Sequence, residues 1–163
     1  MAVYDKDKIV YILDGQIYLI DNSGTFQLSK SGEKIISPAW SNINEISFLK
    51  LNNGVLGDVF SIDDQGSNLK QITRAGDIKA FDKKDNIIVF STIEGLVLTD
   101  ENLQDKKLIY KDGFISQLSL SPDKNYIAFT SSKSNRKEIY VIKTDGNELK
   151  KISKDWESFD PTW

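Results

Sequence analysis

Short apolar runs alternate with polar turns along the whole chain. Each run is four to seven residues long, and no segment of helical length keeps an apolar period of about 3.6 residues. The first two runs, Ile9–Leu13 and Gln16–Ile20, are joined by Asp14-Gly15. Such a pair is a two-residue hairpin signal because Gly accepts a positive φ. The pattern predicts an all-β protein.

The predicted strands form four successive groups. The first is Ile9–Leu13, Gln16–Ile20 and Thr25–Ser29; the second is Lys34–Trp40, Glu45–Leu51, Asp58–Asp63 and Leu69–Thr73; the third is Ile78–Asp82, Asn86–Thr92, Leu96–Thr99 and Lys106–Tyr110; the fourth is Ile115–Leu120, Tyr126–Thr130, Glu138–Lys143 and Leu149–Ser153.

Large apolar residues recur at matched places in these groups. One column precedes a polar turn, with successive members 36, 41, 39 and 43 residues apart. The columns are Tyr4, Trp40, Phe81, Leu120 and Trp163; then Tyr11, Phe48, Phe90 and Phe129; then Tyr18, Phe60, Val97 and Tyr140. A period of about 40 residues indicates repeats. We expect repeats of roughly 3–37, 38–78, 79–117 and 118–157, with a closing strand 158–163, in a single domain 1–163.

Many runs are apolar on both faces, as in Ile87–Phe90 and Ile139–Ile142. A sheet with one face in water would alternate apolar and polar residues, so these sheets are expected to be covered on both sides. Four-stranded units that stack face to face around an axis are typical of propeller blades. The sequence therefore predicts a β-propeller built from four four-stranded blade repeats.

The repeats resemble the TolB-type (WD40-like) β-propeller repeat family. The matching segments are Pro38-Ala39-Trp40-Ser41, Ser121-Pro122-Asp123-Lys124, Ile127-Ala128-Phe129-Thr130-Ser131, Ile139-Tyr140-Val141, Asp145-Gly146 and Lys151-Ile152-Ser153. The second repeat has Asn42-Ile43, and the third has Lys83-Lys84, where the family has Pro-Asp. The resemblance implies a protein-interaction module, and related propellers gate the catalytic domains of some peptidases. The family generally has six to eight blades, whereas this chain has four repeats.

The two ends of the chain suggest how a ring could close. Ser158–Trp163 resembles the innermost strand of a further blade, while almost nothing precedes the first strand at Ile9. We expect Ser158–Trp163 to lie beside Ile9–Leu13 and complete the first blade, which would remove an exposed edge. Closure within one chain gives a monomeric four-bladed ring, and closure between two chains gives a homodimeric eight-bladed ring. A fragment of a longer propeller is the third possibility.

Composition excludes several kinds of chemistry. The chain has neither Cys nor His, so it lacks a thiolate nucleophile, an imidazole base and thiolate or imidazole metal ligands. Its formal net charge is −3, and only Arg74 and Arg136 are Arg, which argues against a nucleic-acid partner. We expect no cofactor. No signal peptide or membrane-spanning run stands out, so the chain reads as soluble without membrane insertion, and its compartment is undetermined.

The candidate partner-binding residues are in loops of the fourth repeat. Ser132–Lys137 is the most basic loop. Trp156 and Phe159 are aromatics in the connection after the last strand of the repeat, either packing wedges or interface anchors. The candidates are Lys133, Arg136, Lys137, Trp156 and Phe159.

Two other motifs are interpreted as turns. The Asp residues at 21, 63, 64, 100 and 145 lie where a third strand turns into a fourth and lack the pattern of a calcium loop. Ser121 and Lys124 match a Ser-x-x-Lys acyl-enzyme motif, but Pro122 places them in a β-turn instead of a helix.

The leading hypothesis is a non-enzymatic β-propeller scaffold that binds a protein or peptide on one face. The alternatives are an accessory propeller of a hydrolase, or a hydrolase itself, acting on peptides or sugars through paired carboxylates. A structural repeat within a larger cell-surface assembly is a third possibility.

Overall fold

The computed structural model describes residues 2–5, 7–52, 54–112, 114–132, 136–154 and 160–163. Every regular element in this part of the chain is a β-strand, and the all-β prediction is confirmed. The chain divides into two compact units, Met1–Gly76 (unit 1) and Asp77–Trp163 (unit 2). No helix among the described residues is long and apolar enough to cross a membrane.

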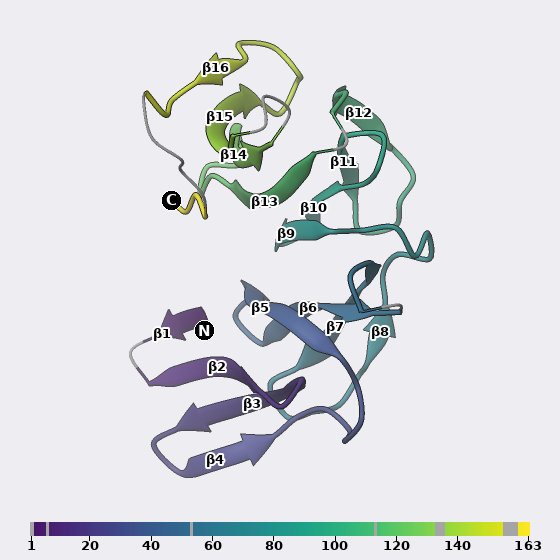
Figure 1. Cartoon of the computed structure of the whole chain (residues 1–163). Helices are drawn as coiled ribbons and strands as arrows, with labels where there is room; N and C mark the ends of the chain where they lie inside the picture. Colours follow the sequence, from purple (N-terminus) through teal and green to yellow (C-terminus); the bar gives the residue numbers. More distant parts are fainter. Residues whose placement is uncertain (1, 6, 53, 113, 133–135, 155–159) are drawn as a thin grey trace. The chain divides into compact units, whose positions relative to one another are not determined.

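Unit 1 contains two four-stranded antiparallel sheets, in the orders β1-β2-β3-β4 and β5-β6-β7-β8 (Figure 1). Each strand lies beside the next one in chain order, as in a meander. The strands are β1 (Ala2–Asp5), β2 (Lys8–Leu13), β3 (Gln16–Asp21), β4 (Gly24–Gln27), β5 (Ile35–Asn42), β6 (Glu45–Leu51), β7 (Gly57–Asp63) and β8 (Lys70–Gln71).

Unit 2 contains the other two sheets, which have the same antiparallel meander order. The strands are β9 (Ala80–Lys84), β10 (Ile87–Ser91), β11 (Leu96–Asp100), β12 (Lys107–Tyr110), β13 (Ile115–Leu120), β14 (Tyr126–Ser131), β15 (Glu138–Lys143) and β16 (Lys150–Lys151). The predicted set of four four-stranded sheets is therefore confirmed.

Two of the aromatic columns are cross-strand pairs between the second and third strand of a sheet. The rings stack in three sheets, where cross-strand neighbours contact each other directly. The stacked pairs are Tyr11 with Tyr18 at 5.6 Å between ring centroids, Phe48 with Phe60 at 5.9 Å, and Phe129 with Tyr140 at 5.7 Å. In the remaining sheet Phe90 is opposite Val97.

Each unit has its own hydrophobic core between its two sheets. In unit 1, Leu19 and Leu28 of the first sheet pack in one cluster with Ile46 and Phe48 of the second. In unit 2 a second cluster joins Leu96 on β11 to residues of the β13–β16 sheet. Burying a large aliphatic or aromatic side chain contributes about 1.5–3 kcal/mol, so each pair of sheets is held together mainly by these contacts.

In three sheets a Ser or Thr follows the fourth strand, and its hydroxyl group continues the hydrogen bonding to the third strand. It accepts a hydrogen bond from a backbone N–H near the start of the third strand. The bonds are Ile17 N–H to Ser29 Oγ at 2.9 Å, Val59 N–H to Thr73 Oγ1 at 2.9 Å, and Ile139 N–H to Ser153 Oγ at 3.1 Å.

An Asp carboxylate closes the turn between the third and fourth strand in every sheet. Its Oδ1 accepts a backbone N–H from two to four residues further on, which is the usual role of Asp in turns. The bonds are Ser23 N–H to Asp21 at 2.7 Å, Ser67 N–H to Asp63 at 2.7 Å, Gln104 N–H to Asp100 at 2.9 Å, and Asn147 N–H to Asp145 at 2.8 Å. The interpretation of these four residues as turn residues is confirmed.

The prediction that Ser158–Trp163 completes the first sheet is wrong. The place beside β2 is taken by β1, whose Ala2 and Val3 are opposite Val10 and Ile9. The described end of the chain lies in unit 2 instead, where the Trp163 indole donates from Nε1 to the Ser119 carbonyl at 2.9 Å. Residues 158 and 159 lie outside the described part of the chain. Ala2–Asp5 is therefore long enough to form the fourth strand of the first sheet. Trp163 is bound by its side chain to Ser119 in unit 2.

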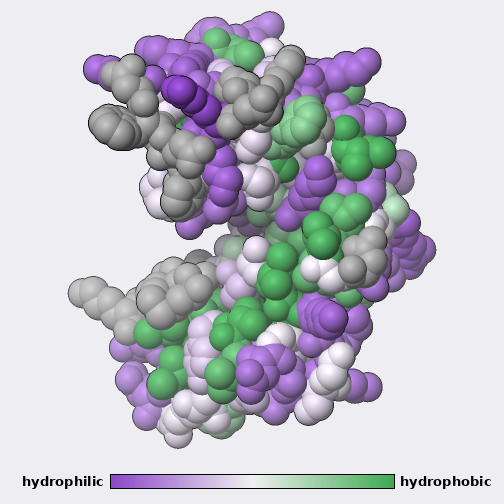
Figure 2. All heavy atoms as spheres, in the orientation of Figure 1, coloured by the Kyte–Doolittle hydropathy of each residue, from purple (hydrophilic) through white to green (hydrophobic). Residues whose placement is uncertain are grey.

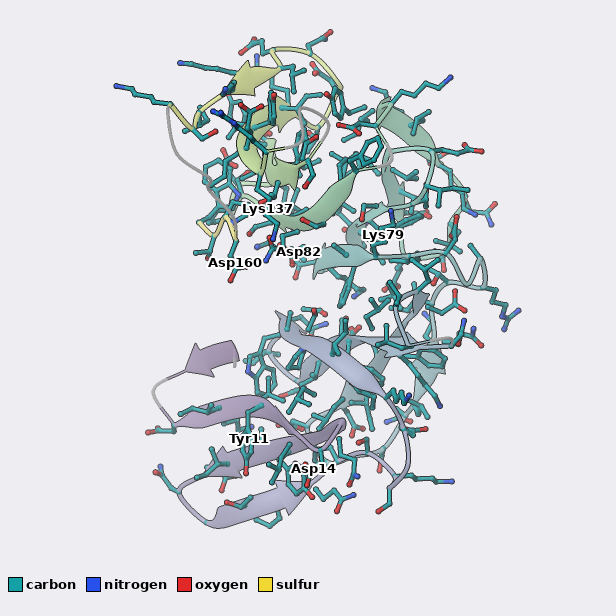
Figure 3. All side chains as sticks on the ribbon, viewed as in Figure 1. Tyr11, Asp14, Lys79, Asp82, Lys137 and Asp160 are labelled. Atoms are coloured by element: carbon teal, nitrogen blue, oxygen red, sulfur yellow. The ribbon has the colours of Figure 1, made fainter. Side chains whose placement is uncertain are left out.

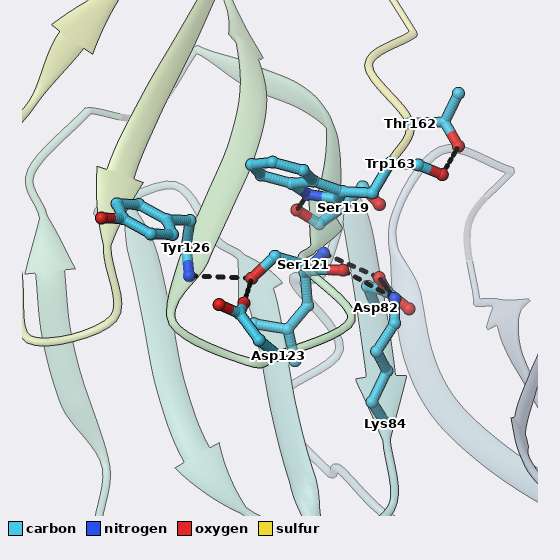
Figure 4. Close-up of polar contacts among 9 residues, drawn as sticks. Asp82, Lys84, Ser119, Ser121, Asp123, Tyr126, Thr162 and Trp163 are labelled. Atoms are coloured by element: carbon cyan, nitrogen blue, oxygen red, sulfur yellow. Dashed lines mark hydrogen bonds and ion pairs between the residues drawn. The ribbon is translucent and has the colours of Figure 1, made fainter.

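Side chains also satisfy backbone groups at the end of β13, an edge strand of its sheet (Figure 4). Leu120 N–H donates to Asp82 Oδ2 at 2.8 Å, and Lys84 Nζ donates to the Leu120 carbonyl at 2.6 Å. An unpaired edge invites association with another strand. The two β9 side chains therefore protect this position on the edge of β13.

Candidate protein-binding surface

Three connections meet at one end of unit 2. They are the β10–β11 turn, the segment between β12 and β13, and the β14–β15 loop. Ser132 N–H donates to the Phe114 carbonyl at 3.2 Å, and Ser91 Oγ donates to the Ile115 carbonyl at 3.4 Å. These bonds place the start of β13 beside the ends of both β10 and β14.

Asp112 holds the connection between β12 and β13 in place. Its side chain is buried; Oδ2 accepts the Ser131 hydroxyl at 2.6 Å, and Oδ1 accepts Phe114 N–H at 2.9 Å. A buried carboxylate that is hydrogen-bonded on both oxygens is strongly anchored. The backbone of Phe114 is therefore fixed, although its side chain is 61% exposed.

The exposed side chains at this end combine apolar and cationic groups. Phe114 and Ile93 are large exposed apolar residues, and Lys111, Arg136 and Lys137 are exposed cations. These five residues define what we call the Phe114 surface. In Figure 3, Lys137 lies directly before β15, and in Figure 2 hydrophilic residues dominate the visible face of unit 2 with smaller hydrophobic areas among them.

An aromatic cluster lies on the strands that carry this surface. Phe129 is fully buried and contacts both Tyr110, at 5.2 Å between centroids, and Tyr140. Burial raises the pKa of the Tyr110 phenol, and the negative charge of Asp112 adds to this. Burial also raises the pKa of Tyr140, whose hydroxyl donates to Glu138 Oε2 at 2.9 Å. Both phenols stay protonated at neutral pH, so they act as packing groups and hydrogen-bond donors.

The structure describes two of the five candidate partner-binding residues. Arg136 and Lys137 are exposed at the same end of unit 2 as Phe114. Lys133, Trp156 and Phe159 lie outside the described residues. Sequence reasoning missed Phe114, although the signal used for Trp156 applies to it as well: it is an aromatic residue outside the repeated columns, in a connection between strands.

The Ser-x-x-Lys motif is a β-turn, as predicted, at the opposite end of unit 2. Ser121 Oγ donates to Asp123 Oδ1 at 2.5 Å and accepts Tyr126 N–H at 2.9 Å (Figure 4). The Lys124 ammonium pairs with Asp85 on the neighbouring sheet of the same unit. The hydroxyl is therefore oriented by turn groups, and the amine is bound to a different carboxylate.

The described residues contain no group of three or more Asp or Glu side chains placed to hold a metal ion. Hydrogen bonds favour the ionised form of two turn carboxylates, Asp21 and Asp123. Hydrogen bonds from Ser23 lower the pKa of Asp21, and the Ser121 hydroxyl lowers that of Asp123. A general acid needs a raised carboxyl pKa, so neither of these two groups suits that role.

No family model and no curated protein matches the sequence. Among solved structures, a putative TolB from Agrobacterium tumefaciens matches over 93% of this chain and 61% of its own, with a TM-score of 0.74 and 13% identity. TolB from Acinetobacter baumannii matches over 93% of this chain and 42% of its own, with a TM-score of 0.74 and 18% identity. An oligogalacturonate lyase in complex with manganese matches over 90% of this chain and 50% of its own, with a TM-score of 0.66 and 12% identity.

The chain spans less than two thirds of the length of each of these solved chains. The likeness shows the fold: the four four-stranded sheets are those of a TolB-like β-propeller.

Proposed function

We propose that the chain is a non-enzymatic β-propeller scaffold that binds an acidic protein or peptide segment on the Phe114 surface. The observation that carries the proposal is the exposed ring of Phe114 on a backbone anchored by buried Asp112. Aromatic and Arg side chains carry most of the binding energy at protein interfaces, and an anchored residue loses little conformational freedom on binding.

Charge sets the expected chemistry of the partner. Lys111 lies in the same connection as Phe114, and Arg136 and Lys137 lie in the β14–β15 loop at the same end of unit 2; all three are exposed cations. Complementary charge speeds association and selects partners more than it raises affinity. The best ligand is therefore a segment in which Asp or Glu residues flank an apolar side chain.

A hydrolase acting on peptides or sugars, or the accessory propeller of one, is the second candidate. One solved chain of this fold is an enzyme that acts on a sugar chain, an oligogalacturonate lyase, although a lyase cleaves by elimination and not by hydrolysis. Such a hydrolase needs two carboxyl groups about 5–10 Å apart, one with a raised pKa. Asp21 and Asp64 both line one depression of unit 1, and hydrogen bonds lower the pKa of each. This pair suits binding better than proton donation, which favours the scaffold.

Affinity measurements on variants test the proposal. The probe is a fluorescent peptide with Asp and Glu on both sides of one Leu, and a copy with Lys in place of the acids is the comparison. Phe114→Ala is expected to weaken binding of the acidic peptide by about 2 kcal/mol. Arg136→Ala and Trp156→Ala should also weaken it, and both more than Lys133→Ala, which should mainly slow association.

Phe26→Ala is the matched control because Phe26 is also an exposed aromatic residue but lies in unit 1. The control should bind the acidic peptide as the unchanged chain does. The proposal would be contradicted by equal loss of affinity for the acidic peptide in Phe26→Ala and Phe114→Ala, or by binding of the Lys peptide that Phe114→Ala weakens to the same extent. If Trp156→Ala lowers the melting temperature instead of the affinity, Trp156 is a packing wedge.

A further inference from the structure

Unit 1 contains a polar depression of about 380 Å³ that the proposed function does not use. Both sheets of the unit contribute to its wall, so it lies where the β1–β4 sheet meets the turn after β7. The lining residues are Leu19, Asp21, Ser23, Phe26, Gln27, Leu28, Asp64 and Gln65. Phe26 is 45% exposed, and its ring contacts no other aromatic ring or cation among the described residues.

Two ionised carboxylates face this space. Asp64 is 8% exposed, and its Oδ2 pairs with the Lys8 ammonium at 2.6 Å. The hydrogen bond from Lys8 lowers the pKa of Asp64. The pKa of Asp21 is lowered mainly by Ser23, with a smaller contribution from the positive charge of Lys8. Two carboxylates and one ammonium leave one net negative charge beside the exposed ring.

Elsewhere in unit 1 an aromatic ring and a carboxylate already hold a cation, the side chain of a lysine of the chain itself. The Lys50 ammonium lies 5.5 Å from the centroid of the Phe60 ring and 2.6 Å from Glu33 Oε1. A ring and a carboxylate together attract a cation through the quadrupole of the ring and the charge of the carboxylate. Phe26 and Asp21 supply the same two parts at the depression.

We propose that this depression binds the guanidinium group of an arginine in a peptide or protein. The planar guanidinium can stack on the Phe26 ring while its N–H groups donate to the Asp21 carboxylate. The Gln65 and Ser23 side chains at the wall offer further oxygen acceptors.

A neighbouring depression favours a peptide over a small molecule. It has a volume of about 280 Å³ and is lined by Asn42, Asn44, Glu45, Ser61, Ile62, Asp63, Asn68 and Lys70. Asp63 lines it, and the next residue, Asp64, lines the first depression. The Asn42 and Asn68 amides already donate to Glu45 and Asp63. The Asn44 amide also lines this depression, and an amide can bond to backbone N–H and C=O groups, so Asn44 suits the peptide backbone beside the bound arginine.

The test is an NMR titration of the full chain with a blocked Gly-Arg-Gly peptide, following the backbone amide signals of Ser23 and Gln65. Saturable shifts are expected. Asp21→Asn should raise the Kd at least tenfold while keeping the turn, because an Asn oxygen can still accept Ser23 N–H. Phe26→Leu should raise the Kd severalfold, and Phe114→Ala should leave it unchanged.

Two further ligands make the test decisive. The same peptide with citrulline, a neutral isostere of arginine, should not bind, whereas equal binding overturns the proposal. Methylguanidinium should bind more weakly than the peptide; if it binds equally well or better, the site recognises a small cation and the peptide assignment is wrong. An unchanged Kd in Asp21→Asn, or shifts only outside unit 1, also contradicts the proposal. These outcomes do not depend on the Phe114 surface.

Discussion

Buried hydroxyl groups in this chain differ in whether they have a hydrogen-bond partner. Thr73 is 2% exposed; its Oγ1 accepts Val59 N–H at 2.9 Å and donates to Asp58 Oδ1 at 2.9 Å. Thr99 is 4% exposed, and its Oγ1 has no partner among the described residues. The sequence places Thr in a predicted strand in both cases and does not distinguish the two roles, because the partners are set by the strand register.

Thr73→Val should lower the free energy of unfolding by about 1–3 kcal/mol. The substitution keeps the shape of the side chain but leaves the buried Val59 N–H without an acceptor and removes a donor from Asp58. Urea denaturation measures the change. Thr99→Val is the matched control and should change stability by less than about 0.5 kcal/mol or increase it, because no bond is lost. Equal losses in both variants would show that the Thr73 bonds contribute nothing.

The alternation of apolar runs and turns predicts the strands well, but it overestimates the length of the fourth strand of a sheet. Leu69–Thr73 and Leu149–Ser153 were each expected to be a whole strand, but β8 and β16 contain only two residues. Ile72 N–H and Thr73 N–H both donate to the Val59 carbonyl, at 2.8 and 3.2 Å. The hydrogen bonding between β7 and the chain after β8 is irregular because Val59 N–H bonds to the Thr73 hydroxyl instead of a backbone carbonyl. The pattern of apolar residues carries no information about this side-chain bond.

The β6–β7 hairpin depends on a Gly that is needed for space. A Cβ added at Gly57 would lie 2.0 Å from the Lys50 carbonyl oxygen, whereas one added at Gly54 in the same hairpin would meet nothing within 4 Å. Gly57→Ala should therefore lower the melting temperature markedly, since the strand must shift. Gly54→Ala should cost only the strain of its φ of +87°, about 1–2 kcal/mol. Thermal unfolding followed by circular dichroism compares the two, and a smaller effect at Gly57 would contradict the register of β6 and β7.

At the scale of the whole molecule, the repeat of about 40 residues in the sequence predicts the fold class. It does so because each repeat forms one sheet, in which residues of two aromatic columns, such as Phe48 and Phe60, stack on each other. The ends of the chain were predicted wrongly. Ala2–Asp5 is too short to show periodicity, yet it pairs with β2, and Trp163 matches a strand column while its indole bonds to Ser119. Two residues of the proposed Phe114 surface, Arg136 and Lys137, are also candidates from the sequence, whereas Phe114 becomes a candidate only from the hydrogen bonds that place the start of β13 beside the ends of β10 and β14.

Hydrogen exchange of the intact chain, with and without the acidic Leu peptide, tests the proposed binding role most directly. Mass spectrometry of proteolytic fragments then locates the protected amides. We predict slower exchange in fragments that contain Ile93 and Phe114, with no change in the turns at Asp21 and Asp145, which belong to the opposite ends of their sheets. Protection at those turns, or no protection anywhere at a peptide concentration that saturates binding, would contradict the assignment of the Phe114 surface as the binding face.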